Sequence, residues 1–304
     1  MNAGNILVLG GTGFIGRQLV AELVRRGCSV TVPTRRRDRA KALTVLPTLN
    51  LVEADVAAPG VLESLAAGCD AVVNLVGVLH SRPAAGGEPF GTDFERAHVA
   101  LPRALALACQ ARGVRRLVHL GALGASANAP SAYLRSKAAG EIALLGATGL
   151  HVTVFRPSVV FGPDDSFLNR FAALSALLPV LMVACPDSRL QPVYVGDVVD
   201  AIVCALDRSA AQSDVVDLCG PRVYRLVELV RMGCAMKHRR RLVVGLPDSL
   251  SWLMAWLLEF TPGPVMTRDN YHSLQVESVS RAPFPFEIQP RVLEDTARAW
   301  LAQG

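Results

Sequence analysis

A glycine-rich segment near the start of the chain constrains the fold more than any other feature. Residues 10–16 read Gly-Gly-Thr-Gly-Phe-Ile-Gly, directly after the apolar segment Asn5–Leu9 and at the start of the amphipathic stretch Phe14–Arg26. Glycine supplies the backbone angles of a tight turn, and the helix that follows offers unpaired N–H groups to phosphates. The segment therefore predicts a strand–turn–helix unit that binds a dinucleotide, with contacts from Gly10, Thr12, Gly13, Phe14, Ile15 and Gly16.

Apolar segments then alternate with amphipathic ones through the first 160 residues. Such alternation indicates a parallel sheet covered by helices on both faces. Right-handed crossovers favour an α/β Rossmann fold with the doubly wound strand order 3-2-1-4-5-6. The expected strands are Asn5–Leu9, Ser29–Pro33, Asn50–Glu53, Ala71–Leu75, Arg115–Leu120 and His151–Arg156. The expected helices are Phe14–Arg26, Val61–Ala67, Phe94–Arg112 and Ala132–Ala147.

The rhythm changes after Arg156, where a segment rich in proline and glycine leads into further helices. We expect a dinucleotide-binding domain over residues 1–160 and a smaller C-terminal lobe over residues 161–304, which binds a substrate or partner. Residues 190–220 should return to the sheet, because Val198–Leu206 has a helical pattern and Val215–Leu218 an extended one. That return predicts a seventh strand.

Basic residues follow the second expected strand, at the place where a site selective for NAD carries an acidic residue. The chain reads Val32-Pro33-Thr34-Arg35-Arg36-Arg37 there. Arg35 and Arg36 can pair with a 2′-phosphate, and one or two charge-assisted hydrogen bonds of about 1.5–3 kcal/mol each favour NADP(H) over NAD(H). A solvated basic loop remains the alternative.

The ends of two more strands are candidates for cofactor contacts. Asp55 and Val56 follow the third strand and could lie beside the adenine. Leu75, Val76 and Gly77 end the fourth strand, at the edge of the sheet that a cofactor must cross. A plain strand end explains Leu75 and Val76 equally well.

Tyr133 and Lys137 lie four residues apart at the start of the helix after the fifth strand. This spacing places both side chains on one helix face. A free tyrosine has a pKa near 10, and a neighbouring ammonium favours its phenolate form. The pair is therefore a candidate acid/base for carbonyl or alcohol chemistry, and Lys137 could also hold the nicotinamide ribose.

Together these motifs resemble the short-chain dehydrogenase/reductase superfamily, in its extended or atypical branch of epimerases and dehydratases. The resemblance covers nearly the whole chain, with further markers at residues 155–163 and 192–198. Within this branch the chain is most similar to the nucleotide-binding accessory subunit of respiratory complex I and its bacterial relatives. The closer similarities are Tyr133–Lys137 with Gly140-Glu141, and a tail from Leu246-Pro247 to Thr267-Arg268-Asp269. The resemblance implies a bound NADP(H), with Pro157 and Val160 on the nicotinamide side.

One position departs from the pattern of catalytic members, which carry a serine after the fifth strand that hydrogen-bonds the reacting oxygen. Gly121 stands where we place that hydroxyl, and Ser126 could replace it only if the loop folds back. Loss of one such donor costs about 10²–10³ in rate. Two functions remain open: a nucleotide-binding protein of weak or absent turnover, and an active oxidoreductase, epimerase or dehydratase that uses Tyr133 and Lys137 on a hydrophobic or sugar-like substrate.

The composition limits the cellular compartment and the kinds of partner that we expect for the protein. The sequence contains seven cysteines, none in a closely spaced pair, which indicates reduced thiols rather than disulfides or a metal site. The two basic clusters, Arg35–Arg37 and Lys237 with Arg239–Arg241, lack interleaved aromatic residues. With a net charge of only +5, we therefore expect no nucleic-acid partner. No apolar run reaches the length of a membrane span, and the strand pattern begins too early for a leader segment. These features predict a soluble, cytoplasmic protein.

Two apolar segments, Ala172–Cys185 and Leu250–Phe260, are expected to be buried helices. The second could instead pack in a homodimer. With Lys237 and Arg239–Arg241 just upstream, it could also lie on an anionic membrane surface or bind a lipid-like ligand. That reading, and the resemblance to a complex I subunit, would place the protein at the periphery of the inner membrane or within a larger respiratory assembly.

Overall fold

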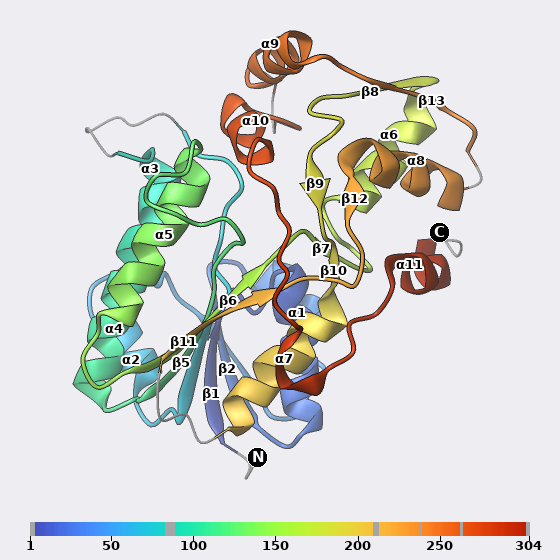
Figure 1. The fold of residues 1–304 in the computed structure, drawn as a ribbon. Helices are drawn as coiled ribbons and strands as arrows, with labels where there is room; N and C mark the ends of the chain where they lie inside the picture. The colour runs from blue at the N-terminus through green and yellow to red at the C-terminus, as the bar shows by residue number, and fades with distance from the viewer. Residues whose placement is uncertain (1–3, 83–88, 209–212, 238, 262–263, 302–304) are drawn as a thin grey trace.

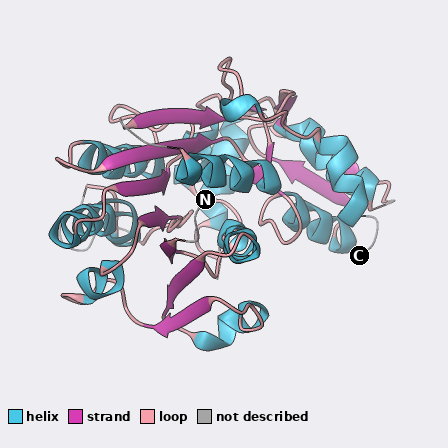
Figure 2. Cartoon of the chain, turned by 90° about the horizontal axis from the view of Figure 1, so that it is seen from below, coloured by secondary structure: helices cyan, strands magenta, loops and turns pink. Residues whose placement is uncertain are grey.

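Seven parallel strands form the central sheet of the computed structural model, which describes residues 4–82, 89–208, 213–237, 239–261 and 264–301. The strand order is β11-β6-β5-β4-β1-β2-β3, so the predicted Rossmann order and its seventh strand are confirmed. Helices lie on both sides of the strands (Figures 1 and 2). The strands are β1 (Asn5–Leu9), β2 (Ser29–Thr34), β3 (Leu49–Glu53), β4 (Ala71–Asn74), β5 (Arg116–Leu120), β6 (His151–Pro157) and β11 (Asp214–Leu218).

The alternation of side chains along β1 explains why both faces of the sheet are covered. Ile6 and Val8 belong to one core and Leu7 and Leu9 to the other, and each of the four is at most 1% exposed. The first core lies under α1 (Phe14–Arg25) and α7 (Val195–Asp207). The second lies under α2 (Val61–Ala66), α4 (Leu101–Arg112) and α5 (Ala132–Leu145). The segment before α4 comprises α3 (Thr92–Phe94) and a π-helical turn over Glu95–Ala100, and a 3₁₀ segment, Arg37–Leu43, follows β2.

The C-terminal lobe has a third core, formed by α6 (Leu168–Leu177), α8 (Leu226–Met236) and the paired strands β8 (Val180–Val183) and β13 (Leu242–Gly245). Two more short pairs join the lobe to the sheet: β7 (Val160–Phe161) with β10 (Val193–Tyr194), and β9 (Arg189–Leu190) with β12 (Tyr224–Arg225). The chain ends through α9 (Asp248–Leu258), α10 (Arg268–Leu274), a 3₁₀ turn at Pro285–Glu287 and α11 (Leu293–Leu301).

The expectation of two buried apolar helices is wrong in both segments. Within Ala172–Cys185 the helix α6 ends at Leu177 and the chain continues as β8, because Pro179 disfavours a helical conformation at Leu178. In α9 only Ser251 and Ala255 are buried, and most of its large apolar side chains face solvent. Along the part of the chain that the structure describes, no helix is long and apolar enough to cross a membrane.

Candidate functional site

The glycine loop joins β1 to α1 and closes tightly on itself. Gly10 has a φ of 78°, and a Cβ there would lie 3.0 Å from the backbone of Leu75, so β4 passes directly beside the turn. A Cβ on Gly16 would collide with the Gly10 carbonyl oxygen and the Gly11 backbone. Gly13 is the N-cap of α1, whose first turn holds no acidic residue. The loop therefore leaves the positive end of a 12-residue helix beside the carboxyl edge of the sheet. Thr12, Phe14 and Ile15 lie in the same turn.

Arg35 and Arg36 lie at the carboxyl end of β2, the strand next to β1. Both side chains are exposed, and Arg36 forms an ion pair with Asp38 at 2.7 Å. The hydroxyl of Thr34 fixes this corner, since it donates to the carbonyl of Arg36 and accepts from its N–H. The two arginines are thus placed beside the glycine loop.

The other predicted strand-end residues line the same edge. Asp55 is exposed and pairs with Arg96 at 3.3 Å, while Val56 packs on the second core. Asn74 accepts the N–H of Val76 at 3.1 Å, which fixes the Leu75–Gly77 backbone next to the glycine loop. Pro157 ends β6. Val160 lies in the next short strand, β7, and pairs with Val193 in β10. These positions lie at or after the carboxyl ends of β3, β4 and β6 in the chain, and their contacts with a cofactor stay a prediction.

Lys137 is buried at the centre of this edge. Its Nζ donates to the carbonyl oxygen of Leu120, the last residue of β5, at 3.0 Å, and a Cβ on Gly77 would lie 3.3 Å from the same Nζ. Burial lowers the pKa of Lys137 to about 8, and the Glu141 carboxylate opposes part of that shift. Lys137 therefore lies between the end of β5 and the segment that follows β4, where a cofactor would cross the sheet edge.

Tyr133 lies one turn before Lys137, with its ring against Phe94 and His98 at centroid distances of 5.9 and 5.6 Å. Burial, with the carboxylates of Glu141 and Asp269, raises the pKa of Tyr133 to about 12. The expectation that Lys137 would lower this pKa is not met, since burial disfavours the phenolate.

A buried histidine supports this tyrosine, and the sequence analysis did not identify it. His98 accepts the N–H of Val78 at Nε2 (3.0 Å), so its proton resides on Nδ1, which faces Ser136 Oγ at 2.9 Å. Ser136 in turn donates to the carbonyl of Tyr133. Burial, and then the charge of Lys137, lowers the pKa of His98 to about 2, so the ring stays neutral. The spacing of Phe94 and His98 on one helix face was the available signal.

The space beside Gly121 is occupied by a buried carboxylate. A Cβ on Gly121 would collide with Glu141 Oε1, while Glu141 Oε2 accepts from Arg156 at 2.6 Å. Among the described residues Oε1 has no hydrogen-bond partner. Ser126 is exposed and its hydroxyl accepts the N–H of Asn128 at 3.3 Å, so the loop does not fold back to restore a donor.

The C-terminal lobe reaches this site through α10. Asp269 accepts the N–H groups of Ala132 and Tyr133 at 2.6 and 3.0 Å, which caps the start of α5 together with the Ser131 hydroxyl. Tyr133 and Val276 both pack against the buried cluster of Ala122, Ala129 and Leu134. The start of α5 therefore contacts residues more than 130 positions away in the sequence. In the sequence, Asp269 is only part of a family resemblance, and its contact with the start of α5 was not predicted.

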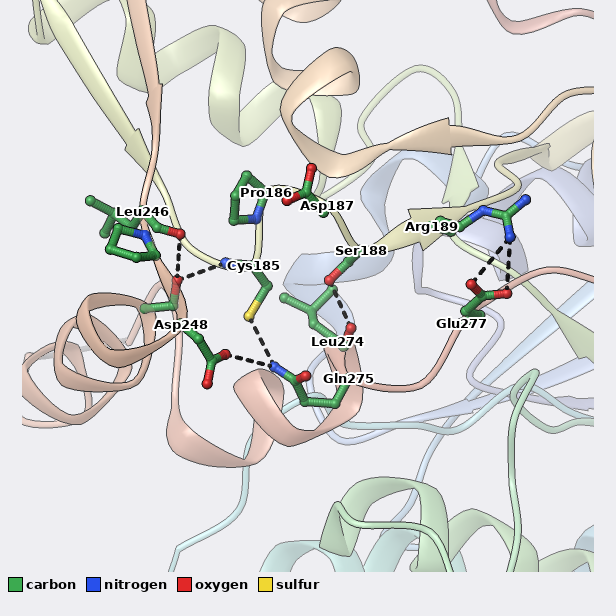
Figure 3. A pocket seen from close by; sticks show the side chains of 12 residues that line it. Cys185, Pro186, Asp187, Ser188, Arg189, Leu246, Asp248, Leu274, Gln275 and Glu277 are labelled. Carbon is green, nitrogen blue, oxygen red and sulfur yellow. Dashed lines mark hydrogen bonds and ion pairs between the residues drawn. The ribbon is translucent and has the colours of Figure 1, made fainter.

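A pocket of about 350 Å³ lies at the other end of α10, near Leu274. Its charged lining consists of Asp187, Arg189, Asp248 and Glu277, and Arg189 pairs with Glu277 at 3.2 Å (Figure 3). Carboxylates outnumber cations in this lining, which disfavours a diphosphate ligand. Among the described residues no group of three or more metal-ligating side chains is found.

The sequence profile described as "NAD dependent epimerase/dehydratase family" matches residues 6–219. The "NADH dehydrogenase [ubiquinone] 1 alpha subcomplex subunit 9, mitochondrial" of Mus musculus is 32% identical over 297 residues, which cover 94% of this chain and 77% of the relative. The "Ceramide reductase" of Caulobacter vibrioides is 30% identical over 74% of this chain and 64% of its own.

Solved structures have the same fold. A nucleoside-diphosphate-sugar epimerase from Staphylococcus aureus superposes with a TM-score of 0.73 at 15% identity, over 97% of this chain and 99% of that one. A UDP-N-acetylglucosamine 4-epimerase from Methanobrevibacter ruminantium superposes with a TM-score of 0.70 at 19% identity, over 100% and 97%.

Proposed function

Because the chain belongs to the NAD dependent epimerase/dehydratase family, we propose that the nicotinamide dinucleotide it binds is NADP(H), and that it turns this cofactor over slowly or not at all. The placement of Arg35 and Arg36 beside the glycine loop supports NADP(H). The exposed pair between Arg36 and Asp38 contributes about 0–1 kcal/mol. A hydrogen bond to a 2′-phosphate contributes about 1.5–3 kcal/mol, so Asp38 does not prevent that contact.

The proposal of weak turnover rests on the environment of Gly121. No hydroxyl stands there, and the space that a side chain at this position would need is filled by Glu141 Oε1. A carboxylate cannot stabilise an oxyanion, because both would carry negative charge. The cost of the missing donor, about 10²–10³ in rate, is therefore not offset at this position.

The state of Tyr133 supports the same conclusion. Its pKa of about 12 disfavours the phenolate at neutral pH. A positively charged nicotinamide ring bound beside Lys137 would lower that pKa, so the bound cofactor could restore part of the acid/base chemistry.

The alternative is an active NADP(H)-dependent reductase. The intact pair of Tyr133 and Lys137 favours it, and so does similarity to a relative named as a ceramide reductase. In this alternative Tyr133 exchanges the proton, Lys137 holds the ribose and the nicotinamide supplies the hydride. The carboxylate-rich pocket beside α10 favours a hydrophobic substrate with a neutral polar group over a sugar nucleotide.

We place the protein in the cytoplasm as a subunit of a larger assembly. Relatives named as subunits of NADH dehydrogenase support the assembly. All seven cysteines are free thiols, which fits a reducing compartment.

Loading the protein with NADPH and adding a panel of aldehydes and ketones, long-chain members included, separates the two functions. The proposal predicts that the absorbance of the reduced nicotinamide persists, at the same rate of decay in wild type and Tyr133→Phe. Oxidation that depends on a panel member and disappears in Tyr133→Phe would establish the active enzyme instead.

A further inference from the structure

Strands β8 and β13 form a small parallel sheet that is apolar on both faces. Leu181, Val183 and Val243 are buried against the core of the lobe. Their neighbours along the two strands point outward and are also apolar, with exposures of 42%, 62%, 62% and 39% for Val180, Met182, Leu242 and Val244. A sheet with one face in water normally presents polar side chains on that face. The composition of this outer face therefore suits a neighbour other than water.

Helix α9 likewise exposes large apolar side chains to solvent. Its buried side is made by the small residues Ser251 and Ala255. At 100° per residue its solvent side is an arc of roughly 160° without a charged residue. The exposures on this arc run from 37% for Trp256 to 54% for Leu257, and its members are Leu250, Trp252, Leu253, Trp256 and Leu257. Phe260, two residues past the end of α9, is 73% exposed.

These two surfaces belong to one end of the molecule. Figure 1 shows α9, β8 and β13 at the end of the C-terminal lobe farthest from the seven-stranded sheet. Thirteen of the nineteen large hydrophobic side chains exposed among the described residues lie in these elements or the adjoining segments. We call this set the apolar face: Leu177, Leu178, Val180, Met182, Leu242, Val244, Leu250, Trp252, Leu253, Trp256, Leu257, Phe260 and Val265.

Cations adjoin the apolar face. Residues 239–241 are three consecutive arginines that lead directly into β13. Arg239 donates to the carbonyl of Ala172 at 2.9 Å and Arg241 to that of Ser175 at 2.8 Å. These bonds hold the arginine segment against the end of α6, next to the exposed Leu177 and Leu178. Arg240, between the two anchored residues, is exposed.

We propose that the apolar face docks on an anionic phospholipid membrane and lies in the plane of its interface. Helix α9 has 11 residues and is therefore about 16 Å long, roughly half the thickness of the hydrocarbon layer. Trp252 and Trp256, one turn apart on the exposed arc, suit the headgroup level. The arginines supply attraction to anionic lipids. A second copy would bring the same cations to the same face, which favours the membrane as its occupant.

Flotation with vesicles of phosphatidylcholine containing about one third phosphatidylglycerol tests the proposal. Wild type floats, and its tryptophan emission shifts to the blue. Trp256→Glu combined with Leu257→Glu abolishes flotation. Arg240→Gln combined with Arg241→Gln lowers the partition coefficient by about 25-fold, since each cation near the surface contributes about fivefold. Ile142→Glu, on α5 and 63% exposed in wild type, is the matched control and floats like wild type.

Circular dichroism and thermal melting confirm that each variant folds; Leu253→Glu replaces the double variant if that one does not. Wild type that fails to float would overturn the proposal, and so would an apolar variant that floats like wild type. A concentration-dependent dimer in sedimentation velocity that the apolar variant dissolves, without vesicle binding by wild type, would assign the face to a second copy. Nucleotide binding plays no part in this test, so its failure leaves the proposed function untouched.

Discussion

A methyl group on Gly16 tests how tightly the glycine loop is closed. The Cβ of alanine would collide with the carbonyl oxygen of Gly10 and with two backbone atoms of Gly11. These atoms belong to the turn itself and cannot rotate away, so the loop or the start of α1 must move. Overpacking of this kind costs about 1–3 kcal/mol. We expect the free energy of unfolding of Gly16→Ala to fall by that amount.

Urea unfolding and calorimetric titration with NADPH measure the two consequences. Displacing the turn moves the N–H groups that we assign to the phosphates, so we also expect the affinity for NADPH to fall at least tenfold, which corresponds to about 1.4 kcal/mol. Gly146→Ala is the matched control, because Gly146 ends α5 with a φ of −80° and the nearest atom to its Cβ would be the Ile142 carbonyl oxygen at 3.3 Å. We expect its free energy of unfolding to change by less than about 1 kcal/mol. A Gly16→Ala protein with the stability and affinity of wild type would refute the reasoning.

Three further substitutions test other parts of the site. Arg35→Asp should weaken NADPH at least tenfold more than NADH in competitive titration, and equal losses would remove Arg35 from recognition of the 2′-phosphate. Burial lowers the pKa of Lys137 from its ordinary 10.5 to about 8, so between these values this lysine binds more protons in the unfolded chain and contributes stability that rises with pH from about 8 to about 10. Buried thiols with raised pKa values, such as Cys109 and Cys219, act in the opposite direction in wild type and variant alike. The free energy of unfolding of wild type relative to Lys137→Met should therefore rise with pH in urea unfolding, and a difference that does not change with pH would show that Lys137 does not titrate there. Asp269→Ala removes the acceptor of two α5 N–H groups and should cost about 0.5–2 kcal/mol; an unchanged unfolding midpoint would show that this cap is dispensable.

The sheet could be predicted because its signals are local. Successive residues along β1 alternate between two cores, and the glycine loop follows directly, where a tight turn leads into a helix. Strand order then followed from crossover handedness, which acts on every unit of the sheet alike.

The environment of the candidate site could not be predicted in the same way. Asp269 meets Tyr133 across 136 residues, and Glu141 meets Gly121 from a different element. The first contact depends on how the C-terminal lobe packs and the second on how α5 lies across the end of β5, and no local pattern encodes either. The pKa of Tyr133 depends on packing as well, since burial is the largest cause of its rise and the carboxylate of Asp269 adds to it.

The exposure of α9 was missed for a related reason. Its sequence is apolar on every side, and such a helix is usually buried. The lobe covers it along Ser251 and Ala255, with Met254 and Leu258 partly buried beside them, so the opposite side stays in solvent. The apolar sequence therefore predicted the helix correctly, but it could not show which of its sides the rest of the protein covers.

Calorimetric titration of the purified protein with NADPH and with NADH tests the central claim most directly, after mass spectrometry has checked for nucleotide that co-purifies. We expect saturable binding at one site per chain with a preference for NADPH, or NADPH already bound and slow to exchange. A protein that contains no nucleotide and binds neither form would contradict the assignment of the glycine loop as a dinucleotide site.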